Sequence, residues 1–136
     1  MHNQSGYQWG GNVNPSCFVM VNAGTDNSLI QATTGAEVMG ISMEATKAAP
    51  IAGASGYAGV SGDQAQYYPI GSFALVVVGS GGLTAGADVA SDTNGNAVLA
   101  ATTGTSNIYV AGNAKTSANA GELALIYLNP QCKTPT

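Results

Sequence analysis

Residues able to perform acid–base or nucleophilic chemistry are few in this 136-residue chain. The single histidine is His2, whereas a Ser-His-Asp or Cys-His arrangement needs a histidine that the fold holds in place. Asp26, Asp63 and Asp92 lie beside Gly, Asn or Thr, where aspartate is a common turn former. No spacing selects a carboxylate pair for acid–base catalysis. We therefore predict that the protein is not an enzyme and has no catalytic, cofactor-binding or metal-binding residues.

Two loops carry residue types that bind calcium or phosphate in other proteins. Residues 92–96 (DTNGN) place oxygen ligands at alternate positions, but the sixth and twelfth positions of the loop are Ala97 and Thr103 instead of Gly and Glu. Residues 79–82 (GSGG) lack the Lys-Ser/Thr of a phosphate loop. Because Asn-Gly at 94–95 is typical of a β-hairpin, we predict that both loops are turns between strands.

The two cysteines, Cys17 and Cys132, are 132 − 17 = 115 positions apart and have no metal-ligand spacing around them. One interpretation is a pair of free thiols. The other is a disulfide that ties the two ends of the domain together, which would add about 4–5 kcal/mol of stability in the chain-entropy model. Such a bond would form only after release from a reducing cytosol.

Charged side chains are scarce and mostly acidic. They make up 7% of the chain, the net charge is −4, and the only cations are Lys47, Lys115 and Lys133. Binding to nucleic acid or to anionic membranes needs clustered cations, so we predict neither partner. The longest apolar runs, 73–78 and 123–128, are too short to span a bilayer. With no targeting segment visible at the N-terminus, we expect synthesis in the cytoplasm.

The elements that must position these residues are predicted to be short strands. Glycine is abundant, at 19 residues, and strongly helix-forming residues are few. We predict an all-β fold, a small barrel or sandwich, with an extended N-terminal arm (1–16), one β domain (17–128) and a C-terminal tail (129–136). A long Ala/Gly loop spans 44–62, with a helical turn near 44–47. The predicted strands are 17–21, 28–31, 36–43, 63–70, 72–78, 83–89, 96–100, 107–111 and 122–128.

The chain contains a short internal repeat. The tetrapeptide Ala-Thr-Thr-Gly occurs at 32–35 and again at 101–104, each time between apolar segments. The repetition suggests two similar strand–turn–strand units in one barrel or sandwich.

From Ser72 onward the chain resembles the capsid decoration (cement) proteins of tailed phages. The motifs that carry the resemblance are SFALVVVG at 72–79, GLTAGADVASD at 82–92, NGNAV at 94–98 and, in the first half, GAEVMGIS at 35–42. The resemblance implies a small β-barrel-like virion protein, commonly a homotrimer, that binds the major capsid protein on the outside of the capsid. Low charge suits such close packing against other chains.

Tyr7 and Trp9 are the predicted capsid-binding residues, because aromatic side chains dominate interface hot spots. The competing interpretation is that the arm which carries them is a disordered tail. Two other functions remain open from the sequence: a phage fibre, spike or adhesin-like β module that binds a glycan or protein, and a small secreted binding module held by a Cys17–Cys132 bridge.

Overall fold

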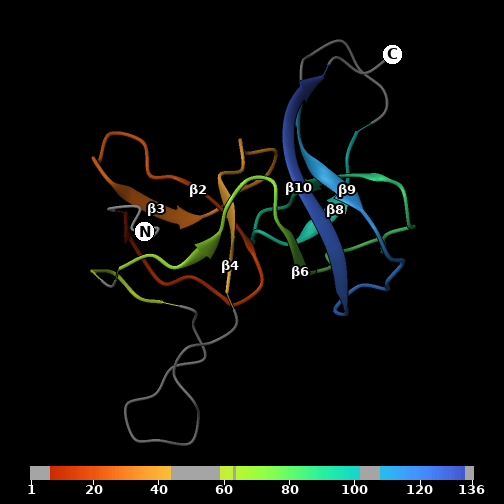
Figure 1. Ribbon diagram of the computed structural model, residues 1–136, viewed down its shortest axis with the longest axis horizontal. Coiled ribbons are helices and arrows are strands. Elements are labelled where there is room, and N and C mark those ends of the chain that lie inside the picture. Colours follow the sequence, from red (N-terminus) through yellow and green to blue (C-terminus); the bar gives the residue numbers. More distant parts are fainter. Residues whose placement is uncertain (1–6, 44–58, 63, 102–107, 134–136) are drawn as a thin grey trace, which may run out of the picture.

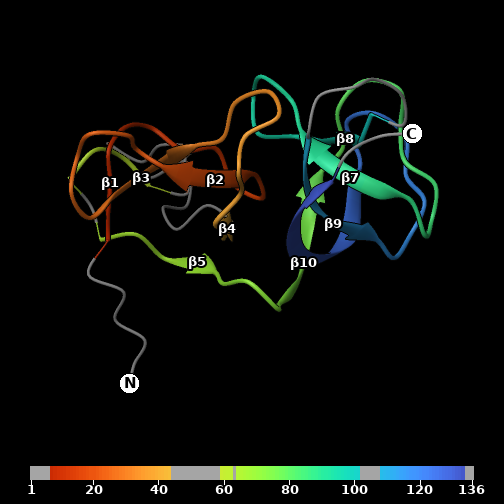
Figure 2. The same cartoon turned by 90° about the horizontal axis from the view of Figure 1, so that it is seen from above.

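The computed structural model describes residues 7–43, 59–62, 64–101 and 108–133, and within these ranges the chain forms ten β-strands and no helix. The predicted all-β fold is therefore confirmed. The strands build two five-stranded sheets, which lie side by side in two views at right angles (Figures 1 and 2).

The first sheet comes from the N-terminal half and has the order β1-β3-β2-β4-β5. Its strands are β1 (Gln8–Trp9), β2 (Phe18–Val21), β3 (Ser28–Gln31), β4 (Gly40–Ser42) and β5 (Tyr67–Tyr68). The strands β2 and β3 pair antiparallel through Val19↔Gln31 and Val21↔Leu29. The predicted turn between them contains Gly24 at φ +82° and Asn27 at φ +54°, two residue types that tolerate a left-handed backbone.

The second sheet, of the order β6-β10-β9-β7-β8, curls until its edges meet. An isolated parallel bridge joins Val78, after β6, to Ala97 in β8, and the Gly79 amide donates to the Ala97 carbonyl at 2.7 Å. The sheet is thus a partly closed barrel, and Figure 1 shows its longest strand, β10, running along it. The strands are β6 (Phe73–Val77), β7 (Asp88–Ser91), β8 (Ala97–Leu99), β9 (Ile108–Ala114) and β10 (Leu123–Lys133).

One hydrophobic core joins the two sheets. Alternate residues of β6 and β10, such as Val76 and Ile126, are fully buried, as the two-residue period of a strand requires. They share a cluster with Phe18 and Ile41 from the first sheet. A smaller cluster lies inside the first sheet alone.

The tip of the β7–β8 hairpin inserts its backbone into the first sheet. The Phe18 amide donates to the Gly95 carbonyl at 2.8 Å, and Gln31 Nε2 donates to the Asn94 carbonyl at 2.6 Å. Gly95 has φ +77°, and a Cβ there would lie 2.9 Å from the Phe18 oxygen, so both the turn and the close approach require glycine. The hairpin predicted from Asn94-Gly95 is confirmed, and it also fastens the two sheets together.

Several predicted boundaries differ from those in the structure. Predicted strand 83–89 is replaced by a later strand, β7, because Leu83 forms an isolated bridge to Ala118 and Gly86 turns the chain at φ +92°. Strand β10 continues to Lys133, so residues 129–133 belong to the sheet and not to a tail. The predicted helical turn at 44–47 and most of the second Ala-Thr-Thr-Gly copy lie outside the described residues.

Candidate functional site

Trp9, predicted to anchor the protein on a partner, is a core residue. Its strand β1 pairs parallel with β3 through Trp9↔Leu29, and its indole is 2% exposed in a cluster with Val13, Val19 and Ala65. The exposed aromatic anchor expected at Trp9 is therefore corrected, because a side chain this large gains more from burial within its own sheet than from exposure.

Tyr7 is half-buried beside Trp9. Its ring lies edge-to-face with that of Tyr67, with 6.3 Å between the ring centroids. The described part of the predicted arm, residues 7–16, is thus attached to the first sheet: the Val13 amide donates to the Gly59 carbonyl at 3.0 Å. The folded domain was predicted to start at residue 17, but part of the preceding segment, residues 7–16, already belongs to the first sheet.

The two cysteines are free thiols in different environments, so the disulfide considered from the sequence is not formed in this structure. Cys17 is buried, with its Sγ 3.7 Å from Asn96 Oδ1. Burial, and then the nearby charge of Asp92, raises the pKa of the Cys17 thiol to about 11. Cys132 is exposed on β10.

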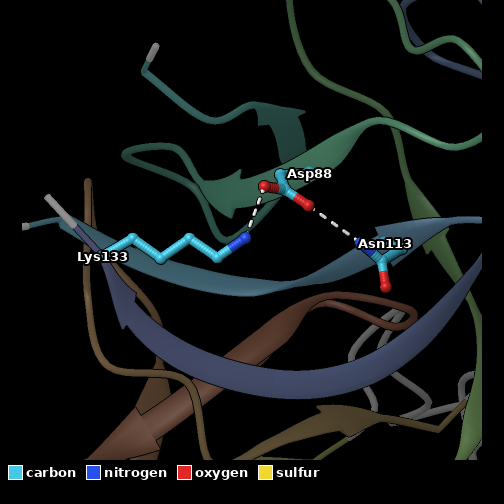
Figure 3. A network of polar contacts seen from close by, with 3 residues as sticks. All are labelled: Asp88, Asn113 and Lys133. Carbon is cyan, nitrogen blue, oxygen red and sulfur yellow. Dashed lines mark hydrogen bonds and ion pairs between the residues drawn. The ribbon is translucent and has the colours of Figure 1, made fainter. Parts of the chain in front are cut away.

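The carboxylates of the second sheet are used to hold the backbone and neighbouring side chains. Asp92 Oδ1 accepts hydrogen bonds from the amides of Asn94 and Asn96 at 2.8 and 2.9 Å, which fixes the hairpin tip. Asp88 lies between Asn113 and Lys133 (Figure 3), accepting from Asn113 Nδ2 at 2.8 Å and pairing with Lys133 Nζ at 3.0 Å. Both carboxylates therefore have structural partners.

Across residues 7–43, 59–62, 64–101 and 108–133, no group of three or more His, Cys, Asp or Glu side chains is placed to hold a metal ion. Within the same ranges, no helix is long and apolar enough to cross a membrane.

The feature best suited to bind a partner is a strip of apolar side chains on the outer face of the second sheet. Three cross-strand pairs of β6 and β10 build it: Phe73↔Tyr127, Leu75↔Leu125 and Val77↔Leu123. Phe73, Leu75 and Leu123 are 56%, 42% and 48% exposed. We call these six residues the outer strip. Contiguous exposed apolar side chains of this kind mark interaction sites more often than isolated ones do.

The outer strip has an aromatic end and a polar margin. The rings of Phe73 and Tyr127 lie 4.8 Å apart, and Lys115 Nζ lies 5.8 Å from the centroid of the Tyr127 ring. Beyond Tyr127, the same cross-strand row continues through Asn113 in β9 to Asp88 in β7. Along this row the outer face is thus apolar at β6 and β10 and polar at β9 and β7.

The strip reaches the edge of the sheet at β6. This strand pairs with β10 on one side, and on the other side the Val77 amide donates to the Ser16 carbonyl at 2.9 Å. This edge is covered in part, because Val78, next along the chain, forms the bridge to Ala97 of β8.

Comparison with solved structures relates this architecture to a phage protein. The chain superposes on the crystal structure of the N base of the head fibre protein gp8.5 from bacteriophage phi29, with a TM-score of 0.55, 18% sequence identity and 90% of each chain covered. At this identity the likeness is one of fold. No family model matches the chain, and a search of curated proteins finds no match.

The outer strip was not predicted from the sequence, and of the two predicted capsid-binding residues Trp9 is buried while Tyr7 is half-buried. A signal for the strip was present: residues 73–78 are apolar at every position, and a strand that is apolar on both faces is typical of one covered on both sides. In this sheet the inner face is covered by the core, whereas Phe73 and Leu75 on the outer face are exposed.

Proposed function

We propose that this chain is a structural protein of a phage virion that binds the outer surface of the major capsid lattice and stabilises it. The single observation that carries the proposal is the fold shared with a head fibre base over 90% of both chains. The resemblance of residues 72–98 to capsid decoration proteins supports the same location.

Mass action is the proposed mechanism of stabilisation. A protein that binds the assembled lattice, and not its dissociated subunits, lowers the free energy of the assembled state by RT ln(1 + [L]/Kd). A homotrimer would contact several capsid subunits at once, so individually modest contacts would combine through avidity. The scarcity of charge, with a net charge of −4 spread over 136 residues, lowers the cost of desolvating such contacts.

The base of a head fibre is a second candidate, which the structural comparison favours. It differs from a decoration protein in what it carries: a base attaches a projecting fibre to the capsid, whereas a decoration protein acts through its own contacts. An adhesin-like module, the remaining alternative, would bind a cell-surface glycan or protein and not the capsid.

Cross-linking mass spectrometry and cryo-electron microscopy of virions that contain the chain would test the proposal. We expect cross-links to the major capsid protein, together with density for the chain on the outside of the shell, repeated over the lattice. Density that continues into a projecting fibre would select the head-fibre base. Cross-links confined to tail proteins, or a free protein that binds host cells and not capsids, would contradict a capsid-binding function.

A further inference from the structure

We propose that the outer strip is the surface through which this chain contacts the capsid, and that the contact brings a carboxylate of the major capsid protein to Lys115. The inference rests on the proposed function and adds to it the docking face and the chemistry of its partner.

The strip has the composition of an interface core. None of its six residues is charged, and it has an aromatic pair at one end. Aromatic side chains that lose water on contact are among the groups that contribute most to binding, while charged residues are depleted from interface cores. Because β6 is at one end of the strand order, the strip extends to the border of the sheet.

Lys115 determines the charge expected on the partner. Within the part of the chain that the structure describes, the one ion pair joins Lys133 to Asp88, and Lys115 contacts the Tyr127 ring without a carboxylate partner. Glu122, which precedes the strip residue Leu123, accepts a hydrogen bond from the Asn119 amide at 2.8 Å. A partner that covers the strip would therefore desolvate a cation that has no carboxylate partner, and a carboxylate on that partner offsets the cost.

The size of the strip favours a lattice over a second copy of this chain in solution. Stable pairs of free proteins bury about 800 Å² on each partner, from 20–30 residues, and the strip supplies six, three of which are half-buried. A surface this small binds weakly by itself. An assembled capsid presents many equivalent sites, so weak contacts made by linked copies are strengthened by avidity.

The test compares charge-introducing variants at matched positions. Leu123→Lys and Leu75→Lys place an ammonium group in the strip, whereas Leu99→Lys places one on β8, outside the strip. Leu99 is 52% exposed and Leu123 is 48% exposed, so the two lysines start from similar environments. Each purified variant is titrated onto capsids prepared without the chain, and its melting temperature and oligomeric state are measured in parallel.

We expect the strip variants to bind capsids about tenfold more weakly or worse than the unmodified protein, and Leu99→Lys to bind within about twofold of it. Lys115→Glu is expected to weaken binding as well, while Lys115→Arg, which keeps the cation, retains it. Melting temperatures within a few degrees of the unmodified protein would show that these changes act at the surface.

Three results would overturn the inference. Strip variants that bind as tightly as the unmodified protein would remove the strip as the docking face, while the proposed function would stand. Strip variants that bind weakly only because they no longer self-associate would make a second copy the occupant. Failure of the unmodified protein to bind capsids would instead refute the proposed function itself.

Discussion

The two sheets place their aromatic side chains in opposite ways. The first sheet buries Trp9 and Phe18, whereas the second leaves Phe73 exposed and Tyr127 half-buried on its outer face. The inner face of β6 and β10 is lined by small and aliphatic residues, among them Ala74 and Ile126, and the buried aromatic ring that packs against them, Phe18, comes from the first sheet. An aromatic residue is therefore a candidate for a partner-binding surface only when its own sheet does not bury its side chain.

The largest expected difference between the two sheets is in the stability effect of truncating one aromatic side chain in each. Trp9→Ala is expected to lower the free energy of unfolding by about 3–5 kcal/mol, because it removes a buried indole and leaves a cavity. Phe73→Ala is expected to lower it by about 1 kcal/mol or less, since the ring is largely in water and loses mainly its contact with Tyr127. Urea denaturation of both variants measures the difference; equal losses would contradict the assignment of the two rings to core and surface.

The thiols provide a second contrast. Cys17 is buried with a pKa raised from 9.0 to about 11, so at pH 8 its thiolate population is about 100-fold lower than that of a thiol at the unshifted value. We expect a thiol reagent to label Cys132 rapidly and Cys17 at least about 100-fold more slowly in the folded protein. Mass spectrometry of timed samples identifies the site, and comparable rates would indicate that the first sheet opens readily.

The same shift has a consequence for stability with a definite sign. The folded state holds the Cys17 proton more tightly than the unfolded chain does, so this stabilisation is complete below pH 9 and is lost as the pH rises from 9.0 through about 11. Cys17→Ser, as the control, should lack this component of the decline in stability over that range.

A glycine tests how closely the first sheet packs around its aromatic core. A Cβ at Gly59 would collide with the Trp9 ring, whereas a Cβ at Gly11 would meet nothing within 4 Å. We expect Gly59→Ala to destabilise the protein by about 1–3 kcal/mol through overpacking, and Gly11→Ala to change stability by less than about 0.5 kcal/mol. Thermal melts of the two variants measure this; a neutral Gly59→Ala would show that the indole is free to move.

The smallest expected effect concerns the polar margin of the outer face. Lys133→Ala removes the ion pair with Asp88, whose two side chains are 45% and 38% exposed. Exposed pairs of this kind contribute about 0–1 kcal/mol. We expect a loss in that range that shrinks further in 1 M salt, measured by chemical denaturation. A larger loss would mean that the Asp88–Asn113–Lys133 contacts stabilise the curl of the sheet itself.

The sequence was sufficient to predict the fold class and most of the strands. Apolar segments at 72–78 and 122–128 and the turn at Asn94-Gly95 are local signals, and the structure reproduces them. Boundaries that depend on distant partners were not predictable. Strand β1 exists because Trp9 pairs with Leu29, and the extension of β10 follows from a bulge between Leu128 and Gln131 that shifts its register against β9.

The candidate surface was harder to predict than the fold. Whether Trp9 or Phe73 is exposed depends on which residues cover each ring, and Trp9 is covered by the backbone of Gly59, about fifty positions away along the chain. The outer strip depends on the register between β6 and β10, which places Phe73 beside Tyr127. Local patterns identify both strands as apolar but do not say which face remains open.

The inserted hairpin tip also sets an order for events during synthesis. The amide of Phe18 is satisfied by Gly95, which the ribosome adds 95 − 18 = 77 residues later. At a translation rate of 5–20 residues per second, Gly95 is added roughly 4–15 seconds after Phe18, and the Phe18 amide lacks this hydrogen-bond partner during that time. A first half that emerges alone would expose part of its core and a strand edge, so this small protein completes the contacts of its N-terminal sheet only after β6 and β7 of the second sheet have been made.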